Sequence, residues 1–242
     1  MTKAVNDEEA RLKYMKKCAD YSGQLILFTV FSIWGFRVLK DYKHMPWFMG
    51  GKFDAIESFE TMATCRPFCE FPRPVHDWFL FTAGYYFGDL IRHVLFEERK
   101  QAFGEFLIHH LASTLLIIGS AYANNVGIGS NISWLHFITD IPIAAVKILS
   151  STVYETSTMV AFLGVLIPSW FYFRLMCLPF YIYLIFSNDK VPYPDPELTQ
   201  FDTFTYLNGV FLCVLQILHV YWFYLFLAML CDYKRSGKAD DS

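Results

Sequence analysis

Four side chains that can take part in chemistry lie inside apolar stretches of the chain. His109 and His110 are adjacent, and His136 and Asp140 follow in the next apolar stretch. Ionisable groups are costly to place in hydrocarbon, so those found there usually belong to functional sites. A His–Asp pair can remove a proton from an amine or a hydroxyl group, and a second His can accept an acyl group or hold a carbonyl oxygen. We therefore predict that these four residues form a catalytic site.

A metal site is the alternative use of the same residues. Three His and one Asp can bind Zn²⁺ and activate water. The sequence has no His-Glu-x-x-His motif, no repeated His-x-x-His-His boxes, no phosphate-binding loop and no nucleophile elbow. We predict that the site uses neither a resident metal nor a cofactor.

Further polar residues share helix faces with these four. At about 100° per residue, Ser113, Ser120 and Asn124 fall on the face of His109, and Lys147 falls on that of His136 and Asp140. The predicted substrate-binding residues are accordingly Ser113, Ser120, Asn124, Lys147, Asn208 and His219. The competing interpretation is interhelical packing for the Ser and Asn residues and a core role for His219. Asp89 with Arg92 is interpreted as a structural ion pair.

The apolar stretches themselves indicate a membrane protein. Of the 242 residues, 55% are hydrophobic, and the stretches approach the length of about 20 residues that crosses a bilayer. We predict an all-α polytopic protein whose polar stripes face an interior cavity. The six predicted transmembrane helices are 21–39, 76–97, 104–124, 129–150, 157–186 and 204–230. Pro168 and Pro179 predict that the fifth is one kinked helix or a helix followed by a bent segment.

Charge and cysteine positions complete the predicted organisation. We expect a charged N-terminal segment at 1–20, a transmembrane domain at 21–232 and a charged tail at 233–242, with both termini on the cytosolic side because Lys and Arg are more numerous there. The net charge of −3 gives no reason to expect nucleic acid as a partner. Cys65 and Cys69 share one loop and can pair if that compartment is oxidising.

The motif around the two adjacent histidines resembles that of a known family. The run Lys100-Gln-Ala-Phe-Gly-Glu-Phe-Leu-Ile-His109-His110 is followed at the family's spacing by Ser120, Asn124, Gly129, His136, Asp140 and Lys147. Arg174-Leu175 with Pro179, and Asn208-Gly209 with the segment from Leu215 to Trp222, are similar to its last two helices. From about residue 12 to 232 the chain resembles the TLC-domain family and, within it, the ceramide synthases.

The resemblance implies a fold and an activity. The family forms a six-helix barrel around a lipid-sized cavity in the endoplasmic reticulum membrane, and its ceramide synthases join a fatty acyl-CoA, as co-substrate, to a sphingoid base. By this resemblance His109 and His110 are the catalytic pair, Asp140 is the second motif aspartate, and Arg174 joins the substrate-binding residues. The expected partners are membrane lipids and these two substrates.

The motif also departs from the family at three positions, so other functions stay open. Phe137 stands where the family has Asp, Gly127 where it has Arg and Ala144 where it has Glu. A missing carboxylate beside a His weakens general-base catalysis. One alternative is a catalytically silent accessory subunit that binds structural lipid within a larger membrane assembly, such as a respiratory complex of the mitochondrial inner membrane. Another is a lipid sensor or carrier that uses the same cavity.

Overall fold

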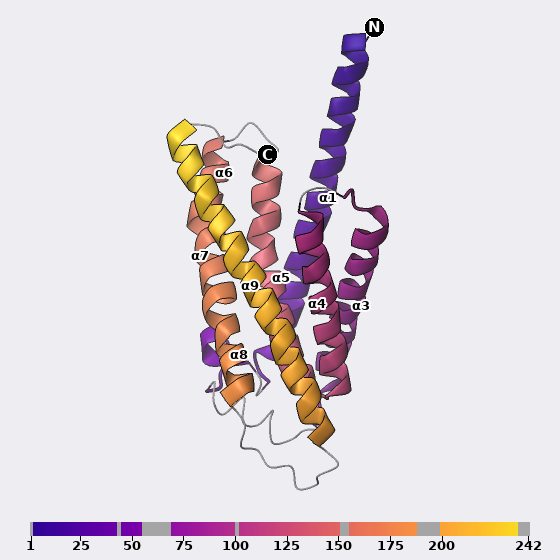
Figure 1. The fold of residues 1–242 in the computed structure, drawn as a ribbon, viewed down its shortest axis with the longest axis vertical. Coiled ribbons are helices and arrows are strands. Elements are labelled where there is room, and N and C mark those ends of the chain that lie inside the picture. The colour runs from indigo at the N-terminus through magenta and orange to yellow at the C-terminus, as the bar shows by residue number, and fades with distance from the viewer. Residues whose placement is uncertain are drawn as a thin grey trace.

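Nearly all of the chain that the structure describes is helical. The computed structural model describes residues 2–42, 45–54, 69–99, 102–150, 155–187 and 199–236 (Figure 1). Within them no β-strand is present, which confirms the predicted all-α class. The principal helices are α1 (Thr2–Leu39), α3 (Arg73–Phe96), α4 (Phe103–Tyr122), α5 (Val126–Ser150), the α6–α8 stretch (Glu155–Ser187) and α9 (Thr199–Ser236).

Five helical stretches within the described residues are long and apolar enough to cross a membrane. They are Tyr14–Leu39, Phe103–Tyr122, Val126–Ser150, Ser157–Ser187 and Thr203–Cys231, close to five of the predicted spans. The remaining predicted span, 76–97, corresponds to α3, which has 24 residues but is not among the five. Its charged residues, Arg73, Asp77, Asp89 and Arg92, lower its mean hydropathy. The predicted membrane class is therefore confirmed, whereas the count of six spans is not.

The two ends of the chain extend beyond the predicted spans. Helix α1 runs without interruption from Thr2, so the charged segment predicted at 1–20 and the first span form one helix that projects beyond its neighbours (Figure 1). Helix α9 continues to Ser236, and the rest of the predicted tail lies outside the described residues. The same holds for Cys65, although Cys69 is disulfide-bonded.

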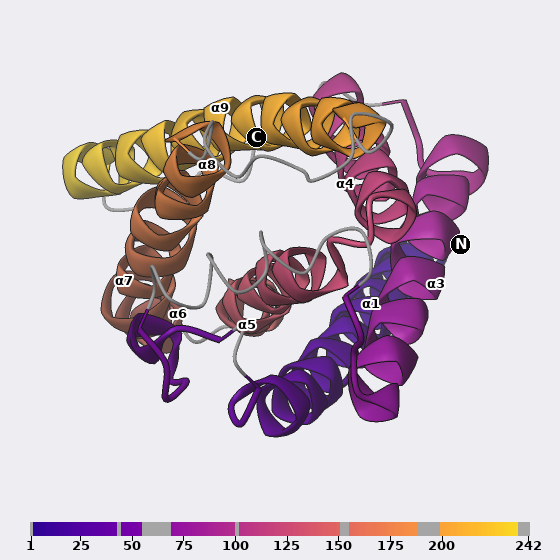
Figure 2. The same cartoon turned by 90° about the horizontal axis from the view of Figure 1, so that it is seen from below.

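Helix α5 supplies the most buried part of the bundle. Every residue from Val126 to Phe137 is buried, because this half of the helix lies between α1, α3 and α4. In the view from below, α1, α3, α4, α9 and the α6–α8 stretch are arranged around α5 (Figure 2). A helix that is surrounded by others can carry polar groups only where those groups meet partners inside the bundle. The polar residues of α5 are therefore aimed at neighbouring helices.

The α6–α8 stretch is one continuous helix with two wider turns. π-helical geometry replaces α-helical geometry at η2 (Phe162–Leu166) and η3 (Phe171–Cys177). Pro168 and Pro179 each follow one of these segments. A proline removes the hydrogen bond to the carbonyl four residues earlier, which in both cases lies in the π segment, so the wider turn accommodates the missing donor. Of the two predicted alternatives, the structure shows one continuous helix and not a helix followed by a separate segment.

The loop that contains residues 45–54 lies beside the α6–α8 stretch, near the end of the bundle opposite the N-terminus (Figure 1). Within 45–54, the backbone carbonyl of Phe48 accepts a hydrogen bond of 2.6 Å from the Tyr172 hydroxyl. The Tyr181 hydroxyl donates to the Met49 sulfur at 3.2 Å. Both tyrosines belong to the α6–α8 stretch, so these contacts fix the loop to that side of the bundle.

Gly35 allows α1 to approach two indole rings closely. A Cβ atom at this position would lie 2.7 Å from Trp78 and 2.8 Å from Trp134. Neither ring is free to move away, because Trp78 donates to the Phe31 carbonyl at 3.2 Å and Trp134 to the Ser32 carbonyl at 2.9 Å. The absence of a side chain at Gly35 therefore permits the packing of α1 against α3 and α5.

We expect Gly35→Ala to lower the free energy of unfolding by about 1–3 kcal/mol, the usual cost of overpacking. Gly23→Ala on the same helix is the matched control, because nothing lies within 4 Å of a Cβ atom there. Alanine favours helix over glycine, so the control variant should be unchanged or slightly more stable. Melting temperatures of the purified proteins in one detergent give the comparison. Equal melting temperatures would contradict the packing described here.

Candidate active site

A cavity of about 410 Å³ lies inside the bundle, between α1, α3, α4, α5, η3 and α9. Its volume is within the range of about 300–1,000 Å³ that is typical of small-molecule sites. The wall combines aromatic rings with ionisable groups, and the polar members are Gln24, Asp89, Arg92, His93, Glu97, His109, His110, His136, Asp140, Lys147 and Arg174. The cavity therefore offers charged and apolar surfaces to one occupant.

The four predicted catalytic residues meet at this cavity. His109 and His110 reach it from α4, and His136 and Asp140 reach it from α5. The ring centres of His109 and His136 are 6.1 Å apart. Two predicted substrate-binding residues, Lys147 and Arg174, line the same cavity. Residues from three separate predicted spans are thus brought together.

His219 completes a cluster of three imidazoles. Its ring centre lies 6.0 Å from that of His109 and 5.3 Å from that of His136. It is fully buried and does not line the cavity. The structure therefore places this predicted substrate-binding residue behind the cavity wall, in support of the two histidines that form it.

Arg174 holds this cluster together from the π-helical segment η3. The side chain is only 2% exposed, and its guanidinium group donates to Thr139 Oγ1 at 2.7 Å and to Asp140 Oδ1 at 2.8 Å. It also donates to His219 Nε2 at 2.7 Å and to the His136 carbonyl at 3.3 Å. π-Helical segments occur frequently at functional sites. Here the segment places one buried cation at the junction of α5 and α9.

These contacts assign the protons of two histidine rings. Arginine has no acceptor atom, so His219 must accept on Nε2 and carry its proton on Nδ1. His136 Nδ1 lies 2.8 Å from the Ile132 carbonyl, which only accepts, so Nε2 is left unprotonated. Among the described residues, His136 Nε2 has no hydrogen-bond partner, and neither has His109 Nδ1. Two ring nitrogens beside the cavity are therefore available to an occupant.

His110 has a different environment from the other histidines. Its Nδ1 lies 3.1 Å from Asp89 Oδ2 on α3, and both side chains line the cavity. We interpreted Asp89 from the sequence as the partner of Arg92 alone. The structure confirms that pair, at 2.9 Å, and adds the contact with His110. The spacing within α3 could not have indicated it, because the contact depends on how α3 packs against α4.

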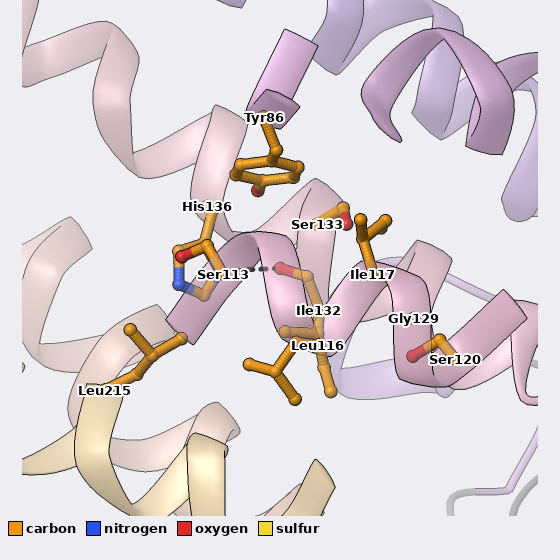
Figure 3. Close-up of a pocket in the computed structure, with 10 residues that line it drawn as sticks. All are labelled: Tyr86, Ser113, Leu116, Ile117, Ser120, Gly129, Ile132, Ser133, His136 and Leu215. Carbon is orange, nitrogen blue, oxygen red and sulfur yellow. Dashed lines mark hydrogen bonds between the residues drawn. The ribbon is translucent and has the colours of Figure 1, made fainter. Parts of the chain in front are cut away.

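A second, much smaller hollow lies next to His136, which also lines the cavity. Its volume is about 30 Å³, enough for a water molecule and too small for a lipid chain. Tyr86 and His136 lie at one end of it, and Ser120 and Gly129 lie at the other (Figure 3). Ser113 also lines it. The predicted substrate-binding serines therefore lie beside the narrow hollow and not beside the larger cavity.

Two other predicted substrate-binding residues lie outside both hollows. Asn124 is in the turn that follows α4, with a positive φ of 49°, and donates to the Cys69 carbonyl at 3.0 Å. Asn208 packs at the contact of α9 with α4, where a Cβ atom on Gly119 would lie 2.2 Å from its Oδ1. Both positions support the competing interpretation, in which polar side chains join segments of the bundle.

Phe137 points away from the histidines into an aromatic cluster. Its ring centre lies 5.0 Å from that of Phe31, 5.3 Å from that of Tyr85 and 5.8 Å from that of Tyr86. It is 1% exposed and does not line the cavity. The cavity is therefore not filled by the residue that replaces the motif aspartate.

The described part of the chain holds no group of three or more His, Cys, Asp or Glu side chains arranged to bind a metal ion. The Zn²⁺ alternative is therefore unsupported there. The cation of Arg174 lies against the imidazole cluster and repels a second cation at the same place.

Comparisons with known proteins agree with the resemblance of the motif. The model of the TLC domain matches residues 17–228. Human ceramide synthase 4 is 31% identical over 163 residues, which are 67% of this chain and 40% of that protein. Ceramide synthase hyl-2 of Caenorhabditis elegans is 28% identical over 97% of this chain and 68% of its own length. Ceramide synthase LOH2 of Arabidopsis thaliana is 24% identical over 98% and 76%. The match thus spans less than half of the human protein.

Proposed function

The chain belongs to the TLC-domain family, and we propose on that premise that it is a ceramide synthase-like acyltransferase, which joins a fatty acyl-CoA to a sphingoid base. The observation that carries the proposal is the presence of two ring nitrogens without partners among the described residues, His109 Nδ1 and His136 Nε2, beside a cavity of about 410 Å³. Unprotonated imidazole is both a base and a nucleophile at neutral pH.

The proposed reaction forms an amide and releases a thiol. The amine nitrogen of the sphingoid base bonds to the acyl carbon, and the bond from that carbon to the CoA sulfur breaks. One histidine removes a proton from the amine and returns it to the leaving thiolate. In a two-step route, His109 or His136 attacks the acyl carbon first, and the leaving thiolate takes a proton from a protonated neighbouring histidine; that histidine, now neutral, then removes the proton from the amine as the amine takes over the acyl group. The aromatic part of the cavity wall offers apolar surface to the hydrocarbon chains of the substrates.

The proposed membrane location is based on the family resemblance. We propose the endoplasmic reticulum membrane, with acyl-CoA entering from the cytosolic end, where Lys147 and Arg92 line the cavity. Positive groups at that end are suited to the phosphates of CoA. The accessory-subunit hypothesis, with its mitochondrial setting, has no support in the comparisons, because the relatives named above are ceramide synthases.

We expect the purified protein to produce N-acyl sphingoid base from acyl-CoA and sphingoid base. The matched control replaces both adjacent histidines, His109→Ala and His110→Ala, and should lose this turnover while keeping its elution volume on gel filtration. Liquid chromatography with mass spectrometry measures the product. A folded wild-type protein without turnover that still retains lipid would favour a sensor or carrier and would refute the proposed enzyme.

A further inference from the structure

We propose that Asp89 positions His110 as the general base of the acyl transfer, and this inference rests on the proposed function. The roles of the histidines then differ. His110 exchanges the proton, whereas His109 and His136 contact the acyl group. The charges that surround each ring support this division.

The contact between His110 and Asp89 fixes the orientation of the ring. His110 Nδ1 lies 3.1 Å from Asp89 Oδ2, and the two side chains are 13% and 14% exposed. A carboxylate only accepts hydrogen bonds, so the proton of the neutral ring is on Nδ1. Nε2 is then the unprotonated nitrogen that can accept a proton from the amine. A carboxylate that holds a His in this way also stabilises the cation that forms.

Asp89 is itself held in place by a second residue. Arg92 donates to its Oδ1 through Nε at 3.0 Å and through a terminal nitrogen at 2.9 Å. The other oxygen, Oδ2, is directed to His110. Arg92 also donates to Glu97, and these two side chains are 46% and 43% exposed. Glu97, Arg92 and Asp89 thus form a series of alternating charges that leads from the exposed end of α3 to the ring of His110.

His109, His136 and His219 have the opposite electrostatic environment. The Arg174 guanidinium donates to His219 Nε2 at 2.7 Å, and the rings of His109 and His136 lie beside His219. A cation at this place opposes the formation of a second one. His110 has a carboxylate as its direct partner instead. Compared with His109 and His136, it is therefore better placed to become charged during the reaction.

The proton that the amine loses is the one that the thiolate gains, so the reaction needs no reactant other than the two substrates. His110 Nε2 takes a proton from the amine as the amine nitrogen bonds to the acyl carbon. The carbon–sulfur bond breaks, and the resulting imidazolium gives the same proton to the thiolate of CoA. Asp89 remains ionised throughout and acts only through His110, so it is a positioning residue.

Asp89→Asn is the variant that tests this role. Arg92 and His110 use different oxygens of Asp89, and in asparagine one of these positions becomes an NH2 group, which donates and cannot accept. We expect kcat to fall by at least about 100-fold, because losing the carboxylate that orients a catalytic His can cost up to about 10⁴-fold in kcat. KM for both substrates should stay within about threefold, because the chains still fill the cavity. Asp89→Glu should restore part of kcat.

Two controls separate positioning from a general loss of structure. Asp77→Asn makes the same change on the same helix, at a carboxylate that pairs with Arg73 at 3.9 Å and does not line the cavity. It should leave kcat unchanged. In a His110→Ala background, Asp89→Asn should cause no further loss, because the two residues act as a unit. An equal loss in both backgrounds, or a loss explained by a lower melting temperature, would overturn the proposal.

A measurement that does not require catalytic turnover tests this inference separately from the proposed function. ¹⁵N NMR of the labelled imidazoles reports which nitrogen carries the proton. We expect His110 to be protonated on Nδ1 in the wild type and to become a mixture in Asp89→Asn. If the wild type has no turnover, the proposed function fails, and this signal still shows whether Asp89 orients the ring. A wild-type His110 protonated on Nε2 would refute the positioning role.

Discussion

Replacing Arg174 with Met is expected to lower the free energy of unfolding by about 3 kcal/mol, the lower end for breaking a buried ion pair. The variant removes the partner of Asp140, which has 27% of its side chain exposed to the cavity and is therefore partly solvated. It also leaves Thr139 and His219 without their donor at 2.7 Å. Methionine has a similar length, so the loss is one of charge and hydrogen bonds more than of volume.

The double variant Arg174→Met, Asp140→Leu is the control. Replacing both members of a buried pair by apolar groups is often neutral, so part of the lost stability should return. Turnover should not return, because His219 would no longer be held in its Nδ1-protonated form and the cluster would lose its orientation. Chemical denaturation in detergent and the N-acylation assay measure the two effects. A stable single variant would show that the guanidinium is not required to hold α5 and α9 together.

His136→Gln is expected to reduce kcat by at least about 1,000-fold, as is usual for removal of a nucleophile or base. The amide oxygen can occupy the place of Nε2 and accept a hydrogen bond, but it can neither take the acyl group nor bind a proton. His136→Asn should fail equally, although it can keep the hydrogen bond to the Ile132 carbonyl that Nδ1 makes at 2.8 Å.

The matched control is His76→Gln, the same change at an exposed histidine of α3 that does not line the cavity. It should behave as the wild type in the N-acylation assay. Intact-protein mass spectrometry after mixing with acyl-CoA alone shows whether an acyl group is transferred to the protein. If His136→Gln retained turnover, the ring nitrogen would be only a hydrogen-bond acceptor, and His109 would be left to contact the acyl group.

Some features of this protein follow from local properties of the sequence. The predicted fifth span, 157–186, agrees with the helical stretch Ser157–Ser187, because hydropathy and helix length are local properties. A departure from regular α-helix near Pro168 and Pro179 was also foreseeable, since each proline removes a backbone donor at a known position. The stripe of His136, Asp140 and Lys147 lines the cavity because helical periodicity alone places these residues on one face.

Other features depended on how one helix meets another. Asp89 was interpreted as the partner of Arg92, and only the packing of α3 against α4 brings its second oxygen to His110. Asn124 was expected on a helix face, but α4 ends at Tyr122 and Asn124 adopts the left-handed conformation that asparagine tolerates. The span predicted at 76–97 forms a helix, two of whose ionic residues, Asp89 and Arg92, line the cavity, so hydropathy alone is a poor measure of its role.

The sequence by itself determined the helical class of this protein and, of six predicted spans, the five that are long and apolar enough to cross a membrane; it also singled out the four predicted catalytic side chains that line the cavity. These depend on composition and periodicity, which act over one or two turns of helix. Only the tertiary structure decided which ring nitrogen carries each proton, which carboxylate meets which histidine and which polar residues merely join helices. Those properties depend on distances of about 3 Å between segments far apart in the chain, and such distances are set by the packing of whole helices.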